Sequence, residues 1–175
     1  MKTESEREYE AFRGKLFSEC SSVVIVTGYL GHAGVQALLG GDIEKPDPER
    51  LKKAVFSVVP EKNVMIFPCG QDGLLGAFYR FSEDTRQGIV VFQEAIPILQ
   101  EDVEYAEERG SDLFFLSAEN SSLIEVPRNS AEKALTALRS EGFPCSAVGT
   151  IAPYPVKEMW RRGRKVYLKR PGRTE

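Results

Sequence analysis

The segment from Asp72 to Ala77, Asp-Gly-Leu-Leu-Gly-Ala, has the residue types of an anion-binding loop. It follows an apolar run at 64–67 and a loop at 68–71, and it leads into a helix-like run at 74–83. A strand, a glycine loop and a helix start together place backbone N–H groups where an anion can meet them. The loop contains no lysine, arginine, serine or threonine. The sequence therefore predicts the scaffold of an anion site without its usual charged and hydroxyl groups.

Two interpretations of this loop are open. In the first, Gly70, Gln71 and Gly73 bind an anion or a nucleotide through backbone N–H groups and the helix dipole. In the second, which we favour, Asp72 caps the helix by accepting a hydrogen bond from a backbone N–H two or three residues on. Its carboxylate then occupies the place of an anion. Cys69 lies beside the same helix start, where the pKa of a thiol can be lowered, but an inert, buried thiol is favoured.

Two further loops supply candidate ligand-binding residues. Gly31 and His32 lie in a glycine-rich turn after an apolar run at 23–26, and Glu119 and Asn120 follow later in the chain. The structural alternatives are a surface or turn histidine and a plain connection between two short strands. One histidine and three scattered cysteines lack the closely spaced ligand pairs of a zinc site. We predict no metal site and no catalytic residue.

The basic end of the chain is a candidate contact surface. Trp160, Arg161, Arg162 and Arg164 are residue types that often anchor interfaces, although Trp160 packing over a sheet beside solvated arginines explains them equally. Residues 157–175 carry a net charge of +6, and the rest of the chain carries −9. Such an end binds an acidic partner, or it is a solvated terminal strand. The acidic pI of about 5.4 argues against a dedicated nucleic-acid binder.

The composition is that of a globular protein. The 175 residues, 42% of them hydrophobic and 28% charged, suit one compact domain. The distant cysteines Cys20, Cys69 and Cys145 fit reduced cytoplasmic thiols better than disulfides. No run approaches the roughly 20 apolar residues of a membrane span. The N-terminus is polar and acidic, so we expect a cytoplasmic protein without a secretory signal.

Helical and extended patterns alternate along the chain. We expect helices at 3–20, 32–39, 48–58, 74–83, 100–109 and 131–140. We expect strands at 21–29, 64–67, 88–92, 123–126 and 147–151, and an edge strand at 165–169. Residues 94–98 are expected to leave the third of these strands in an extended conformation, and 113–116 to form a short helix or strand. Asp47 is expected to cap the helix that starts at Pro48. This order predicts an α/β (α+β) domain, a mixed β-sheet with helices packed on it.

Three blocks of sequence carry a family resemblance. They are Val-Thr-Gly-Tyr-Leu-Gly-His-Ala-Gly at 26–34, the 72–77 segment with Ala-Ile-Pro-Ile at 95–98, and the blocks between 110 and 151. In this order they resemble the C-terminal domain of the AIR synthase superfamily. That superfamily includes aminoimidazole ribonucleotide synthetase, selenophosphate synthetase, thiamine-monophosphate kinase and the hydrogenase maturation protein HypE. The HypE-like branch is the most similar, and the resemblance covers residues 22–170.

The resemblance also shows where the chain departs from the family. Full-length members have an N-terminal domain that binds ATP and metal, whereas residues 1–20 here are expected to form a helical extension. Residues 21–170 are then the AIR synthase C-terminal-like domain, and 171–175 are a tail. The family loop His-Asp-Pro-Thr-Arg-Gly-Gly is replaced by 67–73, of which only the final glycine is kept. The terminal cysteine of HypE proteins has no counterpart in this sequence.

These features imply a stand-alone AIR synthase-related domain that is non-catalytic alone. It would act as a partner-dependent subunit, or as a regulatory module for a nucleotide or phosphorylated ligand, linked to hydrogenase maturation. The alternative is an ATP-dependent enzyme of the superfamily that is completed by oligomerisation or by a separate ATP-binding chain, with ATP and Mg²⁺ held only with that partner. The expected partner is an ATP-binding-domain protein or a second copy, with no membrane and no nucleic acid.

Overall fold

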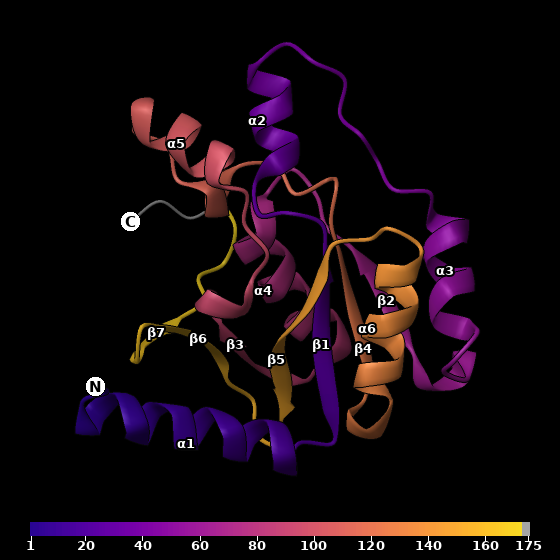
Figure 1. Cartoon of the computed structure of the whole chain (residues 1–175), viewed down its shortest axis with the longest axis vertical. Helices are drawn as coiled ribbons and strands as arrows, with labels where there is room; N and C mark the ends of the chain where they lie inside the picture. The colour runs from indigo at the N-terminus through magenta and orange to yellow at the C-terminus, as the bar shows by residue number, and fades with distance from the viewer. Residues whose placement is uncertain (173–175) are drawn as a thin grey trace.

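The computed structural model describes residues 1–172, which form a seven-stranded mixed sheet with helices on both faces (Figure 1). The strand order is β2-β4-β1-β5-β3-β6-β7. The strands are β1 Ser22–Thr27, β2 Met65–Pro68, β3 Gly88–Phe92, β4 Ser122–Pro127, β5 Cys145–Ala152, β6 Lys157–Arg161 and β7 Arg164–Tyr167. The helices are α1 Glu4–Glu19, α2 His32–Leu38, α3 Pro48–Phe56, α4 Gly73–Thr85, α5 Gln100–Glu108 and α6 Ala131–Ser140. The predicted α/β fold with a mixed sheet is confirmed.

The central strand is β1, which pairs antiparallel with β4 on one side and β5 on the other. Its β-branched run has no alternation of polar and apolar residues, a pattern typical of a strand buried on both faces. Val24, Ile25 and Val26 are fully buried. Because side chains alternate along a strand, Val24 and Val26 enter one core and Val23 and Ile25 the other.

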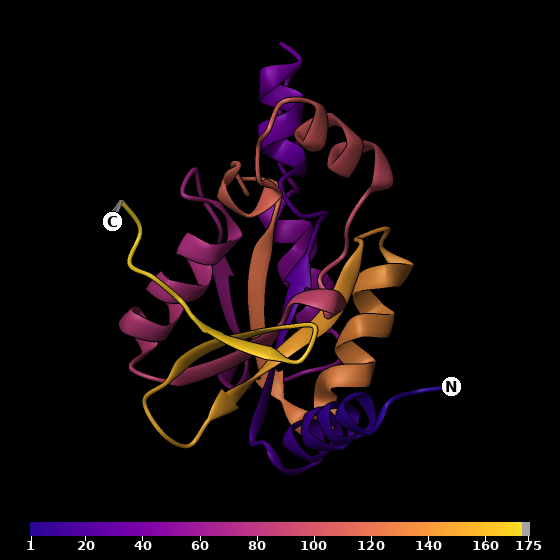
Figure 2. The same cartoon turned by 90° about the vertical axis from the view of Figure 1, so that its left-hand side faces the viewer.

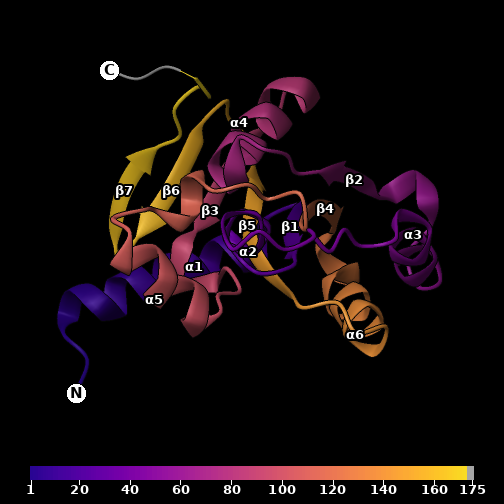
Figure 3. The ribbon, with the colours of Figure 1, turned by 90° about the horizontal axis from the view of Figure 1, so that it is seen from above.

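Two helical layers close these cores. On the first face, Phe78 and Phe81 of α4 are fully buried against the sheet. On the second face, α3 and α6 pack against each other and cover β1 and β4, with Val55 and Leu138 fully buried. Figure 3 shows α4 on one side of the strands and α6 on the other.

Helix α1 covers another part of the sheet through aromatic contacts with β3 and β6. The ring centroid of Phe12 lies 4.8 Å from that of Trp160, and the ring centroid of Phe17 lies 5.6 Å from that of Phe92. The helix expected at 3–20 is confirmed. Its status as an extension separate from a 21–170 domain stays a prediction.

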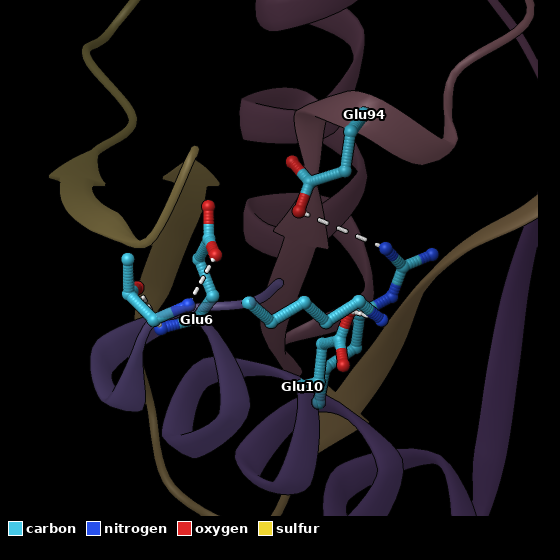
Figure 4. Close-up of polar contacts among 6 residues, drawn as sticks. Glu6, Glu10 and Glu94 are labelled. Atoms are coloured by element: carbon cyan, nitrogen blue, oxygen red, sulfur yellow. Dashed lines mark hydrogen bonds and ion pairs between the residues drawn. The ribbon is translucent and has the colours of Figure 1, made fainter.

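A polar contact supplements these rings. The carboxylate of Glu94 accepts a hydrogen bond from the hydroxyl of Tyr9, and its Oε1 lies 3.7 Å from Nη1 of Arg13. In Figure 4 Glu94 stands opposite α1, on which Glu6 and Glu10 lie. Burial and the bond to Glu94 raise the pKa of the Tyr9 phenol. The raised pKa favours the neutral phenol, which donates the hydrogen bond to Glu94.

Some local expectations are corrected. Strand β6 was not predicted, because its two apolar residues lie among charged ones and show no clear alternation. It pairs in parallel with β3, while the other pairings of the sheet are antiparallel. The ambiguous segment 113–116 forms a 3-10 turn over Leu113–Phe115. The expected extended exit at 94–98 overlaps a 3-10 turn at Gln93–Ala95. Among residues 1–172, no helix is both long and apolar enough to cross a membrane.

Candidate functional site

The Asp72 side chain does not cap helix α4. Asp72 occupies the N-cap position, but its carboxylate accepts no hydrogen bond from the first turn. It binds Arg80 instead, with 2.7 Å from Oδ2 to Nε and 2.9 Å from Oδ1 to Nη2. This geometry is possible because residue 76 is glycine: a Cβ there would lie 2.4 Å from Oδ2 of Asp72. The capping prediction is therefore wrong, because both carboxylate oxygens of Asp72 accept from the Arg80 guanidinium in a bidentate, charge-assisted pair. That bond raises the pKa of Arg80.

The glycines of the loop serve close packing. Gly73 has a φ of 76°, and a Cβ at this position would lie 2.4 Å from the carbonyl oxygen of Phe114. The N–H of Gly73 donates to the carbonyl of Gly70 over 3.3 Å, and the same carbonyl accepts from Ala118 over 2.9 Å. The Gly73 donor is thus directed into the loop itself. Anion binding by the backbone of Gly70, Gln71 and Gly73 stays a prediction.

Cys69 lies at the buried side of this loop. Its exposed fraction is 8%, and burial raises the pKa of its thiol to about 12. The weaker opposing influence is the Arg80 guanidinium, which lowers that pKa. An inert, protonated thiol fits this environment, and a reactive thiolate does not.

His32 forms a pair that the sequence did not reveal. It is the first residue of α2, it is half-buried, and its Nδ1 lies 2.9 Å from Oδ2 of Asp102 on α5. The side chain of Asp102 is 5% exposed. A carboxylate on one ring nitrogen fixes the orientation of an imidazole, so the pair joins α2 to α5. We expected a surface or turn histidine, and the structure places His32 half-buried at the start of α2 and paired with Asp102.

Asn120 and Glu119 both contact residues of the segment that contains α2 and the loops on either side of it. The amide of Asn120 donates to the carbonyl of Tyr29 over 3.1 Å, and its Oδ1 accepts from the N–H of Ala33 over 3.3 Å. Glu119 lies 3.7 Å from the ammonium of Lys45. Asn120 thus ties its own loop to the turn that contains Gly31, which has a φ of 67°.

The predicted ligand-binding loops therefore meet at one end of the sheet. The segment 117–120 contacts both others, since Ala118 donates to Gly70 and the carbonyl of Ser117 accepts from Gly34 over 3.2 Å. Sequence reasoning placed these residues in separate loops, and the topology brings them together. In Figure 1 this end lies beneath α2 and α5.

The four residues proposed for partner contact divide between different surroundings. Trp160 is half-buried under α1, with its indole N–H buried and without a hydrogen-bond partner among residues 1–172. Arg161 points to the opposite face, where its guanidinium lies 5.2 Å from the ring centroid of Phe114. Arg162 forms the turn of the β6–β7 hairpin, and Arg164 is exposed on β7. They do not form one continuous patch.

Arg161 instead lines a pocket of about 560 Å³, here called the tail pocket. The chain after β7 runs toward α4 (Figure 2). Residues 168–172 of this segment line one wall of the pocket. Its apolar lining includes Leu75, Phe115, Met159, Val166 and Leu168, its cations are Arg161, Lys169 and Arg170, and its carboxylates are Asp72 and Asp112. The pocket thus joins a residue of the predicted ligand loop to one of the predicted contact patch.

The charges of the tail pocket favour an anion. Asp72 is paired with Arg80, and Oδ1 of Asp112 accepts from the N–H of Phe114 over 2.9 Å. The Nε–H of Arg161 is buried and has no hydrogen-bond partner in the described part of the chain. A buried guanidinium donor without an acceptor is costly, so an anionic group beside it is stabilised. Within residues 1–172, no group of three or more His, Cys, Asp or Glu side chains is arranged to hold a metal ion.

Sequence reasoning missed the carboxylate of Asp102 and the wall at 166–172. Asp102 lies among exposed acidic residues of α5, and no local signal marks it as buried. The sequence predicted an edge strand at 165–169, but it did not indicate that Val166, Tyr167 and Leu168 line a pocket.

No sequence model of a protein family matches this chain. It is 30% identical over 159 residues to a protein of Methanocaldococcus jannaschii named for hydrogenase expression and formation, with 83% of this chain and 47% of that protein covered. Among solved structures, a HypE–HypF complex aligns with a TM-score of 0.73 at 19% identity, over 87% of this chain and 54% of the other. Escherichia coli HypE aligns with a TM-score of 0.72 at 22% identity, over 87% and 50%. A Thermotoga maritima PurLQS structure aligns with a TM-score of 0.62 at 19% identity, over 86% and 26%.

The chain has the AIR synthase-like, or PurM-like, α/β fold. Its fold is HypE-like, and its sequence is similar to that of the archaeal hydrogenase expression and formation protein. The predicted superfamily resemblance is confirmed. The chain spans about half the length of the curated relative that it matches.

Proposed function

We propose that this chain is a cytoplasmic, HypE-like module that binds a phosphate-bearing ligand in the tail pocket and is non-catalytic alone. It works as the partner-dependent subunit of a larger assembly in hydrogenase maturation. The observation that carries the proposal is half-buried Arg161, whose buried Nε–H lacks a partner within residues 1–172 and which lines a pocket that also contains Lys169 and Arg170.

The lining fits an amphipathic anion. Ligand pockets are mostly apolar, with a small number of polar groups that fix orientation. Leu75, Phe115 and Met159 offer contact to a flat or hydrocarbon part of the ligand, and the arginines offer charge-assisted hydrogen bonds to phosphate. A charge pair at 4 Å is worth ~4 kcal/mol at an effective dielectric constant of about 20, which is enough to select an anion over a neutral analogue.

The names of the fold neighbours support the choice of ligand and setting. HypE has been solved in complex with ATP, and PurL in complex with ADP. HypE also forms a complex with HypF. Adenine nucleotides are therefore the first ligands to test, and a maturation protein is the first partner class.

The non-catalytic proposal is supported by how the titratable groups are used. Asp72 is bound by Arg80, and Asp102 is bound to His32, so both carboxylates serve structural pairs. The second candidate is an ATP-dependent enzyme completed by oligomerisation or by a separate ATP-binding chain. It is favoured by the HypE structure solved in complex with ATP, whose fold this chain shares.

Calorimetric titration and thermal shift of the whole chain test ligand binding, with ATP, ADP, AMP and pyrophosphate, each with and without Mg²⁺. We expect binding of at least one of these anions, and a loss of ~10-fold or more in affinity in Arg161→Gln, equivalent to ~1.4 kcal/mol. Arg162→Gln is the matched control, because Arg162 is adjacent, exposed and absent from the pocket lining. Equal binding by both variants, or no binding by the wild-type chain, overturns the proposed pocket.

A second measurement separates the two candidate functions. Release of phosphate from ATP is followed with the pure chain and Mg²⁺ over a range of protein concentrations. We expect no hydrolysis above that of buffer. Hydrolysis whose specific rate rises with protein concentration would establish the enzyme completed by oligomerisation and refute the non-catalytic module.

A further inference from the structure

Strand β7 lies at the edge of the sheet, and its residues are exposed along its length. It pairs antiparallel with β6 on one side and stands last in the strand order. All four of its residues, Arg164–Tyr167, are exposed. In Figure 3 no other element of residues 1–172 lies beyond it. An edge of this kind offers unpaired backbone groups to another chain.

The hairpin geometry fixes which backbone groups face outward. Its two turn residues, Arg162 and Gly163, have φ values of 48° and 79°, as a two-residue type I′ turn requires. Antiparallel ladders alternate between residues that bond across the pair and residues that point away. Since the N–H of Leu168 donates to the Lys157 carbonyl over 2.9 Å, the alternation directs the N–H and C=O of residues 165 and 167 away from β6.

The charge around this edge selects the partner. Arg162, Arg164 and Lys165 are exposed along the hairpin, and Lys169 and Arg170 follow it. Residues 157–172 contain one acidic side chain, that of Glu158, and it is only 10% exposed. It therefore adds little negative charge to the surface of this edge. A second copy pairing through its own β7 would bring equal cations together, which is unfavourable. An extended acidic segment brings opposite charges to the same positions.

We propose that β7 is a docking edge at which an acidic, extended segment of another protein adds as a further antiparallel or parallel strand. Backbone bonds to Lys165 and Tyr167 supply the pairing, and the basic side chains supply the preference for acidic sequence. Tyr167, Lys169 and Arg170 also line the tail pocket, but the strand pairing uses outward backbone groups of β7 and does not require an anion in the pocket.

Fluorescence anisotropy tests the docking with a labelled peptide of roughly ten alternating glutamate and valine residues, long enough to span a typical strand. The wild-type chain is expected to bind this peptide, more weakly as salt rises because the charges are exposed. The matching lysine–valine peptide is expected not to bind. Equal binding of both peptides overturns the proposal, as does tighter binding of single-stranded nucleic acid than of the acidic peptide.

Two substitutions at one position separate backbone pairing from charge. Lys165→Ala and Lys165→Pro both remove the ammonium group, but only proline removes the outward N–H, which is not used in the β6 ladder. We expect the proline variant to bind the acidic peptide ~10-fold more weakly than the alanine variant, a loss of ~1.4 kcal/mol. Emission of Trp160, which lies opposite residue 165 on β6, reports whether the hairpin is intact.

Amide exchange of the wild-type chain gives a readout that does not depend on variants. Addition of the acidic peptide is expected to slow exchange at Lys165 and Tyr167 and to leave Val166 unchanged. Peptide binding without this slowing overturns the strand-addition geometry. Arg161→Gln distinguishes this proposal from the proposed anion site, because it is expected to weaken anion binding in the tail pocket ~10-fold or more and to leave peptide binding unchanged.

Discussion

At the scale of single residues, Gly73 determines how closely the 72–77 loop packs. Its backbone is left-handed, and the space of a Cβ is taken by the carbonyl oxygens of Phe114 and Leu116. Two independent costs therefore oppose any side chain at this position: the left-handed conformation and the collision with backbone that cannot rotate away.

The substitution Gly73→Ala separates these costs when it is compared with Gly40→Ala. Both glycines have a φ of 76°, but nothing lies within 4 Å of a Cβ at residue 40. We expect Gly40→Ala to lower the free energy of unfolding by ~1 kcal/mol and Gly73→Ala by ~2–4 kcal/mol, because overpacking adds to the conformational cost. Urea denaturation measures both. Equal losses of unfolding free energy in the two variants would show that the 72–77 loop accommodates a Cβ at residue 73 without overpacking.

The cysteines differ in accessibility, and their order of alkylation is a second prediction at this scale. Burial raises the pKa of each thiol, to about 12 for Cys69, while Cys20 is only half-buried. Since the thiolate is the nucleophile, Cys69 is almost wholly protonated at pH 8, and its reactivity grows as pH rises toward 12. Mass spectrometry after iodoacetamide treatment should find Cys20 modified first and Cys69 last. Rapid modification of Cys69 in the folded chain would contradict this order.

At the scale of elements, two aspartates show how far local sequence predicts a helix start. Asp47 caps α3 as expected, with its Oδ1 accepting from the N–H of Glu49 over 3.0 Å. Asp72 has the same position before α4 but binds Arg80. The difference depends on a glycine one turn on and an arginine two turns on. Neither enters a capping rule that is based on neighbouring residues.

The same limit applies to the strands and the candidate site. The β-branched run of β1 predicts a buried strand by itself, whereas β6 is a strand because β3 lies beside it. Likewise, sequence named Asp72 and Arg161, but only the path of 166–172 places them in one pocket. Long-range pairing decides these features, and local patterns do not encode it.

Helix α1 is held by its aromatic face, which Phe12→Ala tests. The chain has one tryptophan, Trp160, and it contacts Phe12 directly. Removing the half-buried ring should cost ~1–2 kcal/mol, less than the ~3–5 kcal/mol of a fully buried phenylalanine, and shift Trp160 emission to longer wavelength. Glu8→Ala, at an exposed position of α1, is the control and should change neither. Unchanged emission in Phe12→Ala would mean that α1 does not cover Trp160 in solution.

At the scale of the whole molecule, charge and stability are both unevenly distributed. The acidic body and the basic β6–β7 end meet in one small protein, and salt confines their fields to about 8 Å at physiological ionic strength. The basic end therefore acts on partners that approach it closely. Local stability is expected to differ in the same way, because it depends on burial. No residue of α1 is buried, whereas residues 24–26 of β1 are fully buried.

Hydrogen exchange should resolve this gradient. Segments with few buried contacts open locally at a fraction of the global free energy, whereas central strands exchange through global unfolding. We therefore expect the amides of α1 to exchange well before those of β1, which is paired on both sides by β4 and β5. Phe12→Ala should hasten exchange in α1 further, and it should change β1 only as much as it changes the global free energy of unfolding. If α1 exchanges as slowly as β1, the helix belongs to the cooperative core, and the aromatic contacts with Phe92 and Trp160 stabilise it far more than its exposure indicates.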